Sequence, residues 1–120
     1  MAHPTGKAIS QSSGTGEVEL MEKERIYEKA FEKWGADLQL LMVIEESAEV
    51  QQALTKLFRK GMMDNRSLTH LAEEVADLEI AIEQLKWYYS AGKKKSFGYA
   101  VNTFKKLKLE RLEALVNAGD

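Results

Sequence analysis

The stretches "VIEESAEVQQAL" at residues 43–54 and "HLAEEVADLEIAIEQL" at residues 70–85 decide the fold of this chain. Both are rich in residues that favour helices. Both also repeat apolar side chains every three or four positions, which predicts two amphipathic helices. Each stretch nevertheless carries a group of carboxylates in its middle. These acids need an explanation, because an ionised carboxylate is costly to bury.

Two further segments show the same period, one before and one after this pair. We expect helices at about residues 26–34, 38–60, 68–90 and 99–117. A glycine follows each of them, as is common where a helix ends: Gly35, Gly61, Gly92 and Gly119. Asp37 is the expected N-cap of the second helix, and the candidates for the third are Asp64, Asn65 and Ser67. No segment alternates like a strand, so the sequence predicts an all-α, four-helix bundle-type chain.

Composition limits the classes of function. The chain has 120 residues, of which 44% are hydrophobic, and this predicts one small domain with a real core. A formal charge of -2 gives no overall attraction to nucleic acid or to anionic lipid. The chain has no cysteine, which excludes disulfides and thiolate metal sites and is compatible with the cytoplasm. No apolar run approaches the roughly 20 residues that span a bilayer.

The N-terminal segment has a different character from the rest. Residues 1–20 hold the only proline, three glycines and a group of serines, with no apolar period. They also lack the apolar region of a signal peptide. We therefore expect a flexible leader at 1–20, either an upstream extension or an added segment, and a single folded domain at 21–120.

The carboxylates fall on the apolar faces of the two central helices. At 100° per residue, Glu46 and Glu49 share a face with Met42. Glu74 and Asp77 likewise share a face with Ala81, Leu85 and Tyr88. Because a short loop joins the two helices, we expect them to be antiparallel neighbours. This arrangement could bring both carboxylate pairs together.

Such a cluster needs positive charge, because four ionised carboxylates repel one another. No lysine or arginine lies between the members of either pair on these faces. Ligation by oxygen alone favours Mg²⁺, with Mn²⁺ as a substitute, over Zn²⁺. Two alternatives remain. One is a solvated helix face. The other is a di-iron bundle, which would need a Glu-x-x-His pattern that the chain lacks. His70 is interpreted as a capping or surface residue.

"EESAE" followed by "EEVAD" resembles the EExxE…ExxD signature of the MazG-like all-α nucleoside triphosphate pyrophosphohydrolases. The similarity extends to "FEKWGADLQLLMVIEESAEVQQAL" and "KLKLERL", over about residues 24–115, and it is closest to the single-domain phage and prokaryote type. The resemblance implies Mg²⁺-dependent cleavage of a nucleoside triphosphate to a monophosphate and pyrophosphate, with a possible role in cleaning the nucleotide pool. The best-known MazG proteins have two such domains, whereas this chain has one.

The resemblance also implies roles for individual residues. It assigns metal binding to the four carboxylates Glu46, Glu49, Glu74 and Asp77. It makes Glu45 the candidate for orienting or activating the attacking water. Lys108 and Arg111 fall where family members often place residues that contact the triphosphate.

Aromatic residues and apolar positions suggest two further features. Trp34, Trp87, Tyr88, Tyr89 and Phe97 could form a wall for stacking a base, with core packing as the alternative. The second helix has apolar residues on almost every side, which predicts a homodimer or homotetramer. Two alternative functions remain open: a phosphoribosyl-ATP pyrophosphatase and a non-catalytic helical interaction module.

Overall fold

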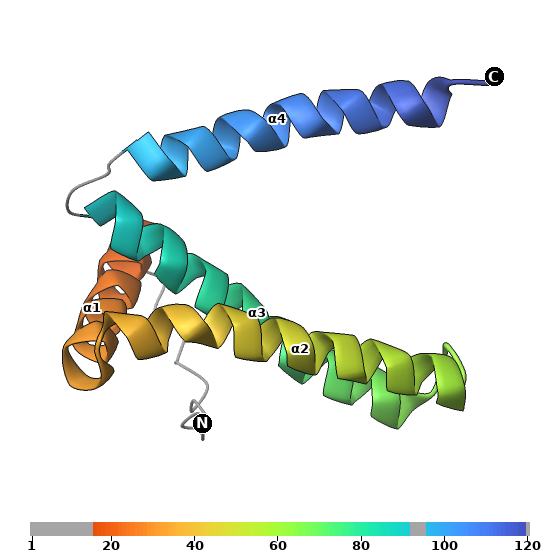
Figure 1. The fold of residues 1–120 in the computed structure, drawn as a ribbon, viewed down its shortest axis with the longest axis horizontal. Coiled ribbons are helices and arrows are strands. Elements are labelled where there is room, and N and C mark those ends of the chain that lie inside the picture. The colour runs from red at the N-terminus through yellow and green to blue at the C-terminus, as the bar shows by residue number, and fades with distance from the viewer. Residues whose placement is uncertain (1–15, 92–95, 120) are drawn as a thin grey trace.

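Four helices and no strand make up the part of the chain that the computed structural model describes, residues 16–91 and 96–119. These are α1 (Gly16–Trp34), α2 (Ala36–Lys60), α3 (Asn65–Ala91) and α4 (Ser96–Asn117) (Figure 1). The all-α prediction is therefore confirmed. The expected helices are all present, and their ends differ from the predicted ones by a few residues, apart from the start of α1.

Glycine and aspartate set the turns between the first three helices. Gly35 (φ 86°) and Gly61 (φ 117°) adopt left-handed backbone angles that suit glycine at a helix end. Asp64 caps α3, because its Oδ2 accepts hydrogen bonds from the Ser67 backbone N–H (3.0 Å) and hydroxyl (2.7 Å). The prediction for Asp37 is wrong: the N-cap of α2 is Gly35. Asp37 lies in the first turn, where its charge favours the helix dipole.

The first and last helices begin earlier than expected. Helix α1 begins at Gly16, inside the segment assigned to the leader. The remainder of that segment, residues 1–15, lies outside the described residues, so the leader stays a prediction. Helix α4 begins at Ser96, three residues before the predicted start. Most of the expected basic loop, at 92–95, also lies outside the described part.

Helices α2 and α3 form an antiparallel hairpin with the largest interface in the chain. Helix α1 lies across one end of this hairpin (Figure 1). The core is thin, and its buried apolar side chains are Tyr27, Met42, Ala53, Leu57 and Ala81. Small residues allow the two hairpin helices to approach closely, since Ala53 and Ala81 are each only 1% exposed.

Aromatic rings join α1 to the end of α3 and to the start of α4. Phe31 stacks on Tyr88, with ring centroids 4.8 Å apart and planes 11° apart. Phe31 also meets Trp87 at 5.4 Å, and Tyr89 meets Phe97 at 5.4 Å. This cluster fixes the end of the hairpin that lies away from the α2–α3 turn.

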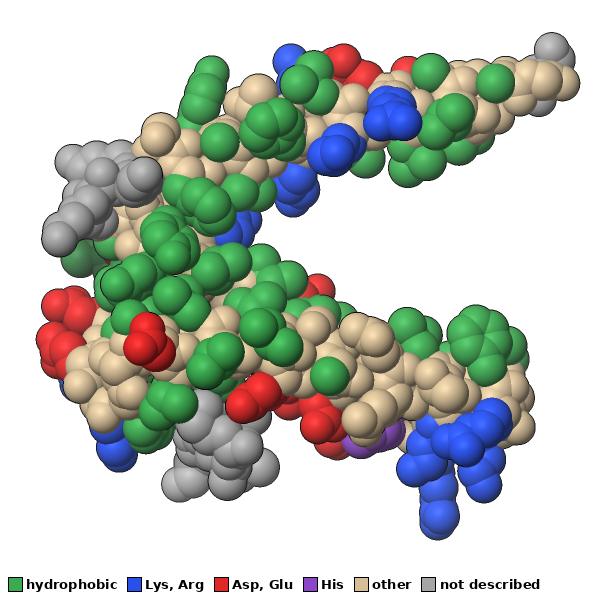
Figure 2. All heavy atoms as spheres, in the orientation of Figure 1, with side chains coloured by type: hydrophobic (Ala, Val, Ile, Leu, Met, Phe, Trp, Pro, Cys, Tyr) green, Lys and Arg blue, Asp and Glu red, His purple; other side chains and the backbone are tan. Residues whose placement is uncertain are grey.

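Helix α4 extends away from the other helices. It contacts α3 but has no buried residue. The radius of gyration is 17.4 Å, whereas a compact chain of this length would have about 14 Å. Figure 2 shows open space between α4 and the hairpin, with hydrophobic side chains on both sides of it. None of the described helices has the length and apolarity needed to cross a bilayer.

Candidate metal centre

The α2–α3 interface brings three of the predicted carboxylates together. One oxygen each from Glu46, Glu74 and Asp77 can be chosen so that all three atoms lie within 4.8 Å of one another. Glu46 comes from α2 and is only 5% exposed, while Glu74 and Asp77 come from α3 and are half-buried. Residues far apart in sequence thus form one acidic cluster inside a helix–helix interface.

The helical period explains why these side chains point inward. Glu46 lies one turn after Met42 and two turns before Ala53, and both neighbours are buried on the same stripe of α2. On α3, Asp77 lies one turn before the buried Ala81. Packing of the apolar residues on these stripes therefore carries the carboxylates into the interface.

Glu49 lies at the edge of this cluster. Three helical positions correspond to 300°, so Glu49 is rotated by about 60° from Glu46. Its side chain is exposed, and it does not belong to the group of three oxygens. The charge of Glu49 nevertheless raises the pKa of Glu74, so the two carboxylates are close enough to interact. Glu49 is positioned to approach the cluster from its open side.

Glu74 shows the electrostatic cost of the arrangement. Burial raises the pKa of its carboxyl, and the negative charges of Glu49, Asp77 and Glu46 raise it further. His70 has the opposite effect: its Nδ1 lies 3.9 Å from Oε1 of Glu74, and its positive charge would lower that pKa. The site therefore favours any cation that can neutralise several carboxylates at once.

The donor set fits a hard divalent cation. Octahedral ligands of Mg²⁺ are about 3 Å apart when adjacent and about 4 Å apart when opposite, so the three oxygens, which lie within 4.8 Å of one another, would move closer together on binding one ion. Three carboxylates from two helices provide a rigid half-shell, and the remaining positions would be left for water or phosphate oxygens. Acidic oxygens without sulfur or imidazole suit Mg²⁺ or Mn²⁺ better than Zn²⁺.

The other predicted site residues lie elsewhere. Glu45 precedes Glu46 on α2 and is exposed. Lys108 and Arg111 lie on the exposed part of α4, which extends away from the hairpin, so a single chain does not bring them to the carboxylates (Figure 1). Trp34 is 40% exposed at the end of α1, and the Nζ of Lys33 lies 5.2 Å from its ring centroid.

The remaining residues of the expected stacking wall belong to the aromatic cluster between α1, α3 and α4. Each makes at least one ring contact there: Trp87, Tyr88, Tyr89 and Phe97. Trp34 has no ring contact with this cluster in the described part of the chain. These contacts agree with the packing alternative for the four residues, whereas Trp34 keeps an accessible face.

A second polar pair in the hairpin was not predicted from the sequence. Gln39 Nε2 donates to Gln84 Oε1 at 2.6 Å, and both residues are buried. The Gln39 Oε1 atom is buried without a hydrogen-bond partner among the described atoms. Gln39 lies seven residues before Glu46, on the same stripe, and this spacing was the available signal. The α2–α3 interface thus has polar side chains at two levels.

Comparison of the chain with protein families, curated proteins and solved structures finds no match.

Proposed function

We propose that this chain is a Mg²⁺-dependent nucleoside triphosphate pyrophosphohydrolase. The observation that carries the proposal is the convergence of Glu46, Glu74 and Asp77 from two antiparallel helices. The resemblance of "EESAE" and "EEVAD" to the MazG-like signature supports the same activity. Cleaning of the nucleotide pool is the cellular role that we associate with it, and the cytoplasm is its expected location.

In this proposal Glu46, Glu74 and Asp77 hold the metal, and Glu49 completes the set from the exposed edge. Bound Mg²⁺ or Mn²⁺ would neutralise phosphate oxygens and lower the pKa of bound water. Glu45, the exposed residue that precedes Glu46 on α2, would orient the attacking water and accept its proton. The helices provide a stiff frame for these side chains, as precise positioning requires.

The proposed reaction is hydrolysis at the α-phosphorus. The water oxygen bonds to that phosphorus, the bond to the bridging oxygen breaks, and its electron pair leaves with pyrophosphate. One proton of the water ends on pyrophosphate and the other is released at neutral pH. The resemblance selects this bond, because carboxylates and a metal could serve hydrolysis at any of the three phosphates.

A screen for pyrophosphate release over standard and damaged nucleotides tests the activity. The reaction should be run in ¹⁸O-labelled water, followed by mass analysis of the products. We expect label in the monophosphate and equal amounts of monophosphate and pyrophosphate. Release of orthophosphate with a diphosphate product, or label only in pyrophosphate, would contradict the assignment. Including phosphoribosyl-ATP in the screen tests the nearest enzymatic alternative.

We further propose that the active form is a homodimer or homotetramer. Helix α4 exposes an apolar stripe that includes Phe104 (58% exposed) and Leu115 (63% exposed), and α2 exposes Phe58 (68%). Lys108 and Arg111 lie within about 40° of the α4 stripe when successive residues turn by 100°. In this proposal a second chain covers the stripe, and its carboxylate cluster comes within reach of these two cations.

A non-catalytic helical interaction module is the second candidate, and the exposed apolar surface of α4 is the observation in its favour. Metal binding separates the two functions. An enzyme of the proposed kind gains thermal stability from millimolar Mg²⁺, because the ion binds the folded state. A module without a metal centre gains none, and it releases no pyrophosphate from any nucleotide in the screen.

A further inference from the structure

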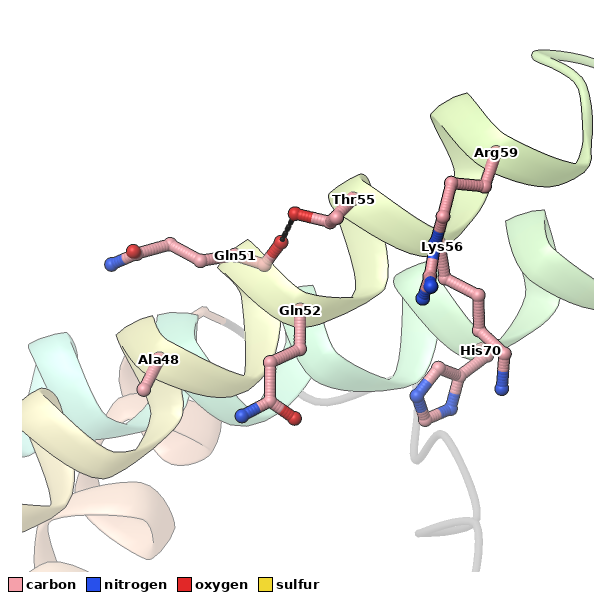
Figure 3. A pocket seen from close by; sticks show the side chains of 7 residues that line it. All are labelled: Ala48, Gln51, Gln52, Thr55, Lys56, Arg59 and His70. Atoms are coloured by element: carbon pink, nitrogen blue, oxygen red, sulfur yellow. Dashed lines mark hydrogen bonds between the residues drawn. The ribbon is translucent and has the colours of Figure 1, made fainter.

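An open groove runs along the hairpin beside the carboxylate cluster. Its volume is about 620 Å³. Seven residues line it, six from α2 and one from α3: Ala48, Gln51, Gln52, Thr55, Lys56, Arg59 and His70 (Figure 3). The polar part of the lining consists of a lysine, an arginine, a histidine, two glutamines and a threonine. It contains no carboxylate and no phenylalanine, tyrosine or tryptophan.

The α2 side of the groove continues the exposed edge of the helix on which Glu49 lies. Glu49, Gln52, Lys56 and Arg59 follow one another at three- or four-residue intervals and therefore share one side of the helix. Side chains on a helix lean toward its N-terminus. Figure 3 shows the Arg59 side chain directed back along the groove toward Gln52, while the Lys56 ammonium lies below α2 beside His70.

The cations of the groove are not neutralised by neighbouring acids. Within the described residues, neither Lys56 nor Arg59 has a carboxylate oxygen within 4.0 Å. Figure 3 shows both side chains on the same side of α2 as the His70 ring. Thr55 Oγ1 donates to the Gln51 carbonyl at 2.9 Å, so its hydroxyl oxygen can still accept a hydrogen bond. An open groove lined by two positive side chains and no carboxylate is suited to bind an anion.

His70 connects this groove to the carboxylate cluster. Its ring lines the groove, and its Nδ1 lies 3.9 Å from Oε1 of Glu74. The positive groove and the negative cluster therefore adjoin along the hairpin. A ligand that crosses this boundary should be a metal-bound anion, with its metal on the carboxylates and its free negative charges among the cations.

We infer that this groove binds the β- and γ-phosphates of the substrate and therefore holds the pyrophosphate that leaves. This inference rests on the proposed function. Glu49 and Lys56 are seven residues apart, about 10 Å along the helix axis, and the Arg59 side chain reaches back along the groove toward Gln52, between them (Figure 3). Arg59 binds phosphate oxygens in a forked geometry, while Lys56 acts as a point charge. Positive charge at this end stabilises the electron pair that the leaving group receives.

The test compares the wild type with the variant Lys56→Gln/Arg59→Gln by calorimetric titration with inorganic pyrophosphate in the presence of Mg²⁺. Both residues are exposed, so the fold should tolerate the change. The matched control is Arg25→Gln/Lys29→Gln, which removes the same charge from exposed positions of α1. We expect pyrophosphate to bind roughly tenfold more weakly to the groove variant, as the loss of charge-assisted hydrogen bonds predicts. The control should stay within about twofold of the wild type.

Equal pyrophosphate affinity in the groove variant and the control would overturn the inference, as would a wild type that binds no pyrophosphate. Lys56→Gln alone provides a second measurement if the double variant folds poorly, and circular dichroism checks its helicity. The nucleotide screen keeps the two claims separate. A wild type that turns over nucleotides, with an unchanged KM in the groove variant, refutes the groove but not the enzyme. Groove-dependent pyrophosphate binding without any turnover refutes the enzyme but supports the anion site.

Discussion

Helix α2 and helix α4 are similar in length and in average hydrophobicity, yet their surroundings differ. Helix α2 has 25 residues and buries five of them, whereas α4 has 22 residues and buries none. Helix α2 packs against α3 along its length, while the described part of α4 contacts only α3 (Figure 1). An apolar stripe therefore contributes to the core only where another helix covers it. For α2 that helix lies in the same chain, and for α4 we propose that it belongs to a second copy.

The largest expected effect concerns the carboxylates of the hairpin. Asp77→Asn removes one negative ligand but keeps the size of the side chain, so turnover should fall by about a hundredfold or more while helicity is preserved. The metal-free protein should be as stable as the wild type or more stable, because repulsion within the cluster decreases. Pyrophosphate release and circular dichroism measure these two effects.

Thermal unfolding with and without Mg²⁺ provides the control for Asp77→Asn. The stabilisation by Mg²⁺ should shrink in the variant. Turnover near the wild-type level in Asp77→Asn would show that the hairpin carboxylates do not take part in the reaction. In that case the contrast between α2–α3 and α4 would have no bearing on catalysis.

Two matched leucine-to-alanine substitutions compare how much α2 and α4 contribute to the free energy of unfolding. Leu57 on α2 is 3% exposed, and Leu57→Ala should cost about 2–4 kcal/mol of unfolding free energy. Leu115 on α4 is 63% exposed, and Leu115→Ala should change that free energy by no more than about 0.5 kcal/mol in an isolated chain. Both changes replace leucine by alanine in a helix, so helix propensity largely cancels. Chemical denaturation at low protein concentration provides the measurement.

The state of association decides whether α4 remains uncovered. We expect at least a dimer at micromolar concentration, because so much apolar surface is exposed on α2 and α4. Light scattering gives the mass directly. The variant Leu112→Glu/Leu115→Glu should shift the mass toward that of the monomer. The control Glu110→Lys changes a charge on α4 outside the apolar stripe and should leave the mass unchanged. A compact monomer for the wild type would require another explanation of the exposed stripes.

The smallest expected effect concerns the ionisation of Tyr27 on α1, which packs at the end of the hairpin. Burial raises the pKa of Tyr27 to about 12, and the charge of Glu83 and a hydrogen bond to it add to the shift. A raised pKa means that folding favours the neutral phenol. The contribution of Tyr27 to stability is therefore complete below its ordinary pKa near 10 and is lost as the pH rises toward about 12.

Ultraviolet titration of the phenols tests this shift. Glu83→Gln should move the last ionisation to lower pH, because it removes a negative neighbour. Tyr27→Phe should remove that component and identify it. An unchanged titration curve in Glu83→Gln would show that α1 does not cover this end of α3 as tightly as the contacts indicate.

The helices and their ends could be predicted from local sequence. Gly35 and Gly61 were expected at helix ends, and Asp64 was one of three candidates for the cap of α3, because these features depend on neighbouring residues only. The prediction that Asp37 is the N-cap of α2 was wrong, because Gly35 both follows α1 and precedes α2. No separate residue is left between the two helices for a side-chain cap. The start of α1 was missed because apolar periodicity was the only signal used.

The sequence predicted the carboxylates as a group, but it did not show which of them are buried in the interface. Sequence spacing put Glu46 and Glu49 on one face, yet the line of closest packing passes through Glu46 and leaves Glu49 at the edge. The groove was missed for a similar reason. Lys56 and Arg59 look like ordinary solvated positions of a helix until α3 places His70 beside them.

The sequence by itself determined the helical class, the positions of the turns and the acidic stripes, because these follow from backbone preference and a fixed 100° rotation per residue. Only the tertiary structure decided which stripes meet. That choice depends on close packing across the hairpin, where Ala53 and Ala81 allow the helices to approach and set their register. The packing of α2 on α3 places Glu46 against Glu74 and Asp77, and no single helix carries that information.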